Sequence, residues 1–124
     1  MKALAAIKPL TSLQSLRIGY IDSIDEGLRY VSGLKSLQSL ELTGSQGTDT
    51  GQSDLTDTGL SHLSRLTNLT SLELFSCHIT DAGLEHLKEL TKLESLFIFH
   101  NTPLNGTGFR HLKRLTNLER LSVT

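Results

Sequence analysis

Leucine residues recur along this 124-residue chain in the pattern Leu-x-x-Leu-x-(Leu/Ile/Val), which returns after 24, 32, 24 and 25 residues. The last two apolar positions of each copy lie two residues apart, and side chains two apart point to the same face of a β-strand. The pattern therefore predicts five short strands, near residues 13–18, 37–42, 69–74, 93–98 and 118–123. A unit with one apolar side cannot bury it alone, so we expect consecutive units to stack on each other.

A second apolar pattern follows each strand, with apolar residues three positions apart. In the third unit this stripe consists of Leu84, Leu87 and Leu90. The spacing is typical of one face of an α-helix or a 3₁₀-helix. Thr80 and Asp81 precede the stripe, at the place where the start of a helix favours a capping oxygen. Each unit is thus predicted as strand, turn, short helix and turn.

Two stretches depart from this periodicity. Residues 1–12 correspond to the helical half of a unit, so the chain is predicted to begin with a half repeat. Residues 43–54 contain eight extra residues, no apolar residue and three glycines, which indicates a solvated loop. We interpret this inserted loop either as a rim or lid for a nearby site or as a tolerated surface insertion.

The leucine-based strands, together with the motif Cys-x-Ile-Thr-Asp-x-Gly-Leu at residues 77–84, resemble the leucine-rich repeat family over essentially the whole chain. The motif looks like the Thr-Asp-x-Gly-Leu subtype of cysteine-containing and many bacterial arrays. The resemblance implies an α/β solenoid that forms a short arc, with a parallel β-sheet on the concave side and short helices on the convex side. It also implies protein–protein recognition, usually through the concave face.

Two features depart from the family pattern. The position after each strand usually holds Asn or Cys, but here it holds Ile21, Ser45, Cys77 and Asn101. Because Ile21 cannot donate or accept a side-chain hydrogen bond, we expect the first turn to be looser or differently bonded. The second feature is the bare edge of a parallel sheet at the last strand. We expect one domain over residues 1–124 whose last edge is covered by a longer array, covered by a partner, or frayed.

Aromatic side chains gather on the face of the sheet that the leucines do not occupy. Phe75, Phe97 and Phe99, three of the four phenylalanines, lie between the inward positions and so face outward. Phe75 and Phe99 occupy equivalent positions on neighbouring strands, so we expect them roughly 5 Å apart. Exposed apolar patches of this kind mark contact sites. The candidate partner-binding residues are Phe75, Phe97 and Phe99 as anchors, Glu73 and Arg17 as polar selectors, and His100 and Tyr20 near the same end.

The size of this face limits the strength of binding. Five strands of about six residues give a face of roughly 400 Å², about half of what one partner contributes to a stable interface. We therefore predict a non-catalytic module that binds a protein or peptide, weakly unless further surface takes part. The alternative is a structural part of a longer array, in which the rings contact the rest of that chain or a second copy.

Catalytic, metal and cofactor sites are not expected. His62, His86 and His111 recur at one helical position, but adjacent helices lie about 8–10 Å apart, whereas zinc needs ligand nitrogens within about 2.1 Å. The aspartates within residues 49–57 do not have the spacing of a calcium loop. Because the sequence contains no phosphate-binding loop and no nucleophile motif, we predict no enzyme, no cofactor and no metal.

The charge distribution bears on partners and location. The formal net charge is -1, which favours neither nucleic acid nor an anionic membrane as the partner. The sequence has no apolar run of the roughly 18 residues that a membrane helix needs, and no secretory signal. We therefore predict a soluble, cytoplasmic chain. Residues 110–120 are basic and residues 22–57 lean acidic, which fits solvated helical faces or head-to-tail self-association through uncapped ends.

Overall fold

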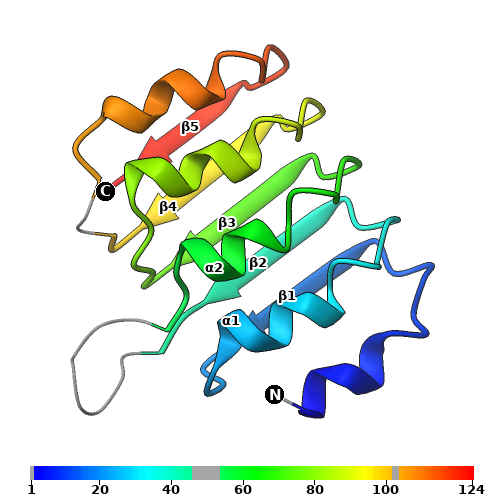
Figure 1. Cartoon of the computed structure of the whole chain (residues 1–124). Coiled ribbons are helices and arrows are strands. Elements are labelled where there is room, and N and C mark those ends of the chain that lie inside the picture. Colours follow the sequence, from blue (N-terminus) through cyan, green and yellow to red (C-terminus); the bar gives the residue numbers. More distant parts are fainter. Residues whose placement is uncertain (1, 46–53, 102–103) are drawn as a thin grey trace.

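The computed structural model describes residues 2–45, 54–101 and 104–124, and the middle of the inserted loop lies outside these ranges. Five parallel strands form one sheet in the order of the chain, and short helices cover one side of it (Figure 1). The units stack, as the leucine pattern predicted, and form the short arc that the family resemblance implied. The strands are β1 (Ser15–Gly19), β2 (Ser39–Thr43), β3 (Ser71–Phe75), β4 (Ser95–Phe99) and β5 (Arg120–Val123).

The helical segments are short, and most of them are 3₁₀-helices. They are η1 (Lys2–Ile7), α1 (Ile24–Gly27), η2 (Leu28–Tyr30), α2 (Asp57–Ser61), η3 (Asp81–Leu87) and η4 (Thr107–Leu112). Apolar residues three positions apart fit this geometry, because side chains at positions i and i+3 eclipse in a 3₁₀-helix. In η3 this places Leu84 and Leu87 on the buried side. None of the described helices is long and apolar enough to cross a membrane.

Each strand begins two residues later than the leucine pattern predicted. The first leucine of each copy belongs to the turn before the strand. Leu37 donates its N–H to the carbonyl of Leu34 at 3.1 Å, and Leu69 donates to Leu66 at the same distance. The side chains of Leu37 and Leu69 are buried, so each of these leucines both closes a turn and packs in the core. The ladder of the sheet starts only after this turn, at a serine in the first four strands.

The strands pair in register, so that equivalent residues form rows across the sheet. Two of these rows point toward the helices and build the core. They are Leu16–Leu40–Leu72–Leu96–Leu121 and Ile18–Leu42–Leu74–Ile98–Val123. In the middle strands these side chains are fully buried, and burying one such side chain contributes about 1.5–3 kcal/mol.

Thr80 and Asp81 lie at the start of their helix, as the sequence predicted, since η3 begins at Asp81. The Thr80 side chain makes no capping bond to η3. It is bound instead by the preceding unit, since Asp57 accepts hydrogen bonds from the Thr80 N–H at 2.9 Å and from its hydroxyl at 2.5 Å. Asp25 accepts the equivalent two bonds from Thr56. The aspartate of each unit therefore holds the start of the next helix, and we call these contacts the aspartate ties.

The residue after each strand differs in role from unit to unit. Asn101 is buried, accepts a hydrogen bond from the Ile79 N–H at 2.7 Å and donates one to the Ile79 carbonyl at 2.9 Å. Cys77 is a buried free thiol, and burial raises its pKa to about 12. Ile21 packs against the core, and the following turn is bonded differently, with the Ile24 N–H 3.5 Å from a carboxylate oxygen of Asp54.

Candidate binding surface

The side of the sheet that carries no helices is built from three rows of outward side chains. We call it the open face, and it is the face that the sequence analysis expected to be concave. The first row is Ser15–Ser39–Ser71–Ser95–Arg120, the middle row is Arg17–Glu41–Glu73–Phe97–Ser122, and the last row is Gly19–Thr43–Phe75–Phe99. The open face therefore changes from hydroxyl groups at the strand starts to charges and aromatic rings at the strand ends.

Three phenylalanine rings form one cluster on the open face, as the in-register pairing of β3 and β4 requires. The ring centroids of Phe75 and Phe99 lie 5.2 Å apart, and those of Phe97 and Phe99 lie 5.7 Å apart. The expected distance of roughly 5 Å between Phe75 and Phe99 is thus confirmed. All three rings are half-buried, because they shield one another while no helix covers them. We call Phe75, Phe97 and Phe99 the aromatic cluster.

Tyr20 and His100 lie beside this cluster, where their strands end. Together with Glu41, Thr43, Phe75 and Ser76 they line one hollow of about 360 Å³. Tyr20, Ser76 and His100 all have left-handed backbone conformations, with φ between 51° and 58°. This conformation costs a non-glycine residue roughly 1–2 kcal/mol, and it turns the chain sharply out of the strand. Tyr20 is 83% exposed, so its ring stands above the hollow.

The charged residues of the middle row are not equivalent. Arg17 donates from Nε to Oε2 of Glu41 at 3.1 Å, and the Arg17 side chain is 79% exposed. Glu73 is half-buried and forms no hydrogen bond or ion pair with any residue that the structure describes. Its neighbours in register are Glu41 on β2 and Phe97 on β4. Arg17 and Glu73, the two predicted polar selectors, therefore differ. Arg17 is paired with Glu41, whereas Glu73 has no partner among the described residues.

The comparison with known families agrees with this geometry. Residues 65–88, which run from the end of one unit through β3 to the end of η3, match the family model described as Leucine Rich repeat. The other units repeat this one in register. The unit at residues 65–88 is a leucine-rich repeat. Modules of this family generally bind proteins and are usually non-catalytic.

The chain was also compared with curated sequences and with solved structures. A search of curated protein sequences gave no significant match. Among solved structures, an internalin from Listeria monocytogenes is similar, with 24% sequence identity and a TM-score of 0.46. The alignment covers 97% of this chain and 44% of the internalin chain. The chain therefore spans less than half the length of that protein.

Three residues beside the aromatic cluster were not predicted from the sequence. Glu41, Thr43 and Ser76 all line the hollow beside the aromatic cluster. Their positions follow from register, since Thr43 is aligned with Phe75 and Glu41 with Glu73. Writing the repeats beneath one another and reading the columns would have found the first two. The left-handed turn that brings Ser76 into the hollow has no comparable signal in the sequence.

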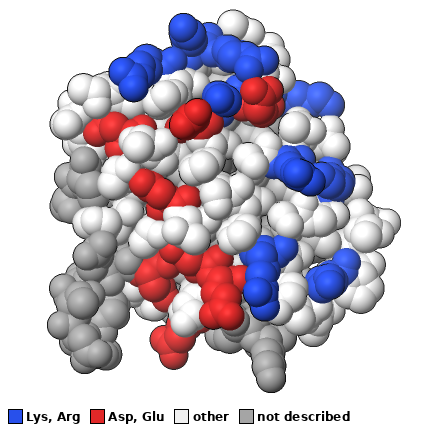
Figure 2. Space-filling model, in the orientation of Figure 1, with Lys and Arg blue, Asp and Glu red and all other residues white. Residues whose placement is uncertain are grey.

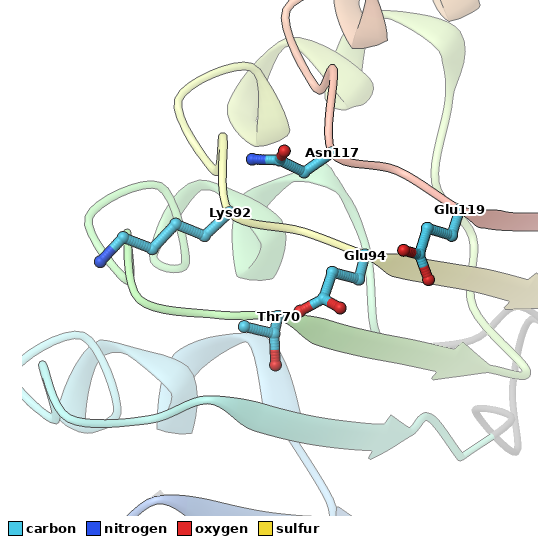
Figure 3. A pocket seen from close by; sticks show the side chains of 5 residues that line it. All are labelled: Thr70, Lys92, Glu94, Asn117 and Glu119. Carbon is cyan, nitrogen blue, oxygen red and sulfur yellow. The ribbon is translucent and has the colours of Figure 1, made fainter.

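A second hollow lies at the opposite edge of the sheet, before the strands begin. Its volume is about 320 Å³, and Figure 3 shows the side chains of Glu94 and Glu119, which directly precede β4 and β5, within it. The lining residues are Thr70, Lys92, Glu94, Asn117 and Glu119. Lys92 donates a hydrogen bond from Nζ to Oδ1 of Asn68 at 2.8 Å. This hollow has no aromatic side chain and is separate from the aromatic cluster, so its carboxylates are useful controls.

The side of the sheet that carries the helices is charged (Figure 2). Figure 2 shows basic side chains gathered at the C-terminal end of this layer and acidic ones spread over its middle. Some of these charges pair locally, as Arg114 does with Glu89 at 2.8 Å. Within the described ranges, no group of three or more potential ligands could hold a metal ion.

Proposed function

We propose that this chain is a non-catalytic recognition module that binds a protein or peptide on the open face of its sheet. The observation that carries the proposal is the aromatic cluster. The Phe99 ring packs against those of Phe75 and Phe97, and all three remain half-buried on a face that none of the described helices covers. Aromatic side chains are enriched among the residues that dominate binding energy, because they bury a large area at a low entropic cost.

The surroundings of the cluster support a contact site. The hollow beside it offers a concave surface of mixed polarity, with Tyr20 and His100 at its margin. Polar groups beside aromatic side chains match the usual arrangement of an interface, which has an apolar centre and a polar rim. The open face alone provides only roughly 400 Å², which corresponds to a weak contact. We therefore propose a short peptide segment or a small protein surface as the occupant.

The test is to replace Phe97 and Phe99 together by serine. A display library of random 12-residue peptides is selected against the wild-type chain and against the double variant, and the melting temperatures of both are measured. We expect the wild type to enrich a family of peptides that the double variant does not retain. We also expect the melting temperature to change little, since both rings face outward.

The matched control is Phe109→Ser. Phe109 is 41% exposed and lies in η4, on the other side of the sheet. This variant loses a phenylalanine that lies away from the open face and should retain the selected peptides. A large fall in melting temperature for the double variant would contradict the proposal, because it would show that the rings belong to a core. Equal peptide binding by the double variant would contradict it as well.

A further inference from the structure

Glu73 is a carboxylate placed beside the aromatic cluster without a partner among the described residues. It is half-buried in the middle row, one strand away from Phe97 on one side and from Glu41 on the other. Adjacent strands lie about 4.8 Å apart, so both neighbours are within reach of a single ligand side chain. Like charges directly opposite each other on a sheet are unfavourable, and a cation bound there would relieve this repulsion.

The same row shows how this surface holds a cation. Arg17 lies on β1 and places its guanidinium against the carboxylate of Glu41 on β2. Glu73 is the next carboxylate in the row, in the same register. Its neighbour on β4 is the aromatic residue Phe97 rather than a cation. A positive group above Glu73 could contact both the carboxylate and the face of Phe97, and cations are attracted to the faces of aromatic rings.

We infer that the open face selects a peptide segment in which a lysine or arginine side chain lies next to an apolar side chain. The cation binds Glu73 and lies over Phe97, while the apolar group packs on Phe75 and Phe99. This inference rests on the proposed function and adds the chemistry of its ligand. It commits to one kind of occupant because the row places an unpaired negative charge directly beside an apolar surface.

Other ligand chemistries fit the surface less well. An acidic segment would meet the carboxylate of Glu73, which no described residue neutralises, and would be repelled. A segment that is apolar throughout would cover Glu73 and remove water from its charge without providing a partner. Burying a charge in this way is strongly unfavourable unless an opposite charge or hydrogen-bond donors replace the water.

The experiment begins with the 12-residue peptides selected on the wild-type chain. Their sequences are compared with those of the unselected library, and we expect lysine or arginine within two positions of an aromatic or aliphatic residue. The tightest peptide is then synthesised with its basic residue and with glutamine at that position. Affinities of both peptides are measured for the wild-type chain and for Glu73→Gln, Glu94→Gln and Arg17→Ser.

These four chains and two peptides form double-mutant cycles that isolate the pairing. We expect the loss of the peptide cation to weaken binding to the wild type about tenfold and to leave binding to Glu73→Gln almost unchanged. Glu94→Gln removes a carboxylate from the second hollow and should behave like the wild type. Arg17→Ser frees the carboxylate of Glu41 and should strengthen binding of the basic peptide only.

The outcomes separate this inference from the proposed function. Selected peptides that depend on the aromatic cluster but show no basic residue, or show no coupling to Glu73, would overturn the inference and leave the binding module intact. Enrichment of acidic peptides would also overturn it. Failure to select any peptide that depends on the aromatic cluster would overturn both.

Discussion

At the scale of single residues, the motif Thr-Asp-x-Gly links one unit to the next rather than stabilising its own unit alone. Asp57 reaches the backbone and hydroxyl of Thr80 in the following helix. The glycine of that following motif, Gly83, is buried against the same carboxylate, and a β-carbon there would overlap Asp57 Oδ1. The glycine is therefore required for a close approach between units, and its conformational freedom is not used.

Replacing Gly83 by alanine should destabilise the chain by about 1–3 kcal/mol, because the added methyl group displaces the carboxylate of Asp57 from its bonds. Gly33→Ala is the matched control, since nothing lies within 4 Å of a β-carbon at that position. It should change the stability by less than about 1 kcal/mol in either direction. Urea unfolding of both variants measures the difference. Equal unfolding midpoints would show that Asp57 adapts without loss.

The last aspartate tie makes the stability of the chain sensitive to acid. Backbone N–H groups of Asn105, Gly108 and Gly106 donate to Asp81, and these bonds hold its pKa below the usual value of 3.8. A carboxyl group whose pKa is lower in the folded state stabilises that state above its unfolded pKa. The contribution is complete above about pH 4 and is lost as the pH falls through the lowered pKa.

The variant Asp81→Asn tests this tie. It should lower the urea midpoint at pH 7, because an amide oxygen cannot replace a carboxylate that accepts three N–H donors. It should also show a smaller loss of stability than the wild type between pH 5 and pH 2. Unfolding curves at several pH values in this range measure both effects. Parallel pH profiles for the two chains would contradict the role of Asp81.

At the scale of elements, the strands and helices follow from leucine spacing, whereas their connections do not. The pattern predicted five strands, and β1 to β5 occur within two residues of the predicted starts. The displacement of the strand starts arises because the first leucine of a copy, such as Leu37, donates its N–H within the preceding turn. The leucine spacing does not reveal this hydrogen bond. Likewise, Thr80 has the sequence of a helix cap, but its partner Asp57 lies 23 residues away, so only tertiary structure reveals the bond.

The turn after β4 depends on one amide side chain. Asn101 satisfies both the N–H and the carbonyl of Ile79 in the preceding unit, and the pair is buried. Asn101→Ala leaves two buried backbone groups without partners and should destabilise the chain by about 2–4 kcal/mol. Asn117→Ala removes one exposed bond, to the carbonyl of Thr91, and should cost less than about 1 kcal/mol. Thermal or urea unfolding compares them, and similar losses would refute the special role of Asn101.

At the scale of the whole molecule, in-register stacking makes the middle of the array the best-packed part. Leu72 in β3 is fully buried, whereas Leu121 occupies the same row in β5 and is 48% exposed. Register also determined how much of the candidate site was predictable. The cluster of Phe75, Phe97 and Phe99 followed from alternation along the strands, but the ion pair of Arg17 with Glu41 depends on side-chain conformations that alternation does not specify.

The gradient of packing across the array gives a direct comparison. Leu72→Ala should destabilise this 124-residue chain by about 2–5 kcal/mol, because it leaves a cavity enclosed by neighbouring units. Leu121→Ala removes the same atoms from the outer unit and should cost about 1 kcal/mol or less, since water already reaches that side chain. Urea unfolding measures both. Equal costs would mean that β5 is enclosed to the same degree as β3 in solution.

The aspartate ties give the array a polarity that the symmetric sheet does not have. Every carboxylate in the series Asp25, Asp57 and Asp81 reaches toward the C-terminal neighbour. A unit that loses its aspartate therefore keeps its tie to the unit before it and loses only its tie to the unit that follows. Damage at Asp57 should propagate downstream into η3 while α2, still held by Asp25, stays in place.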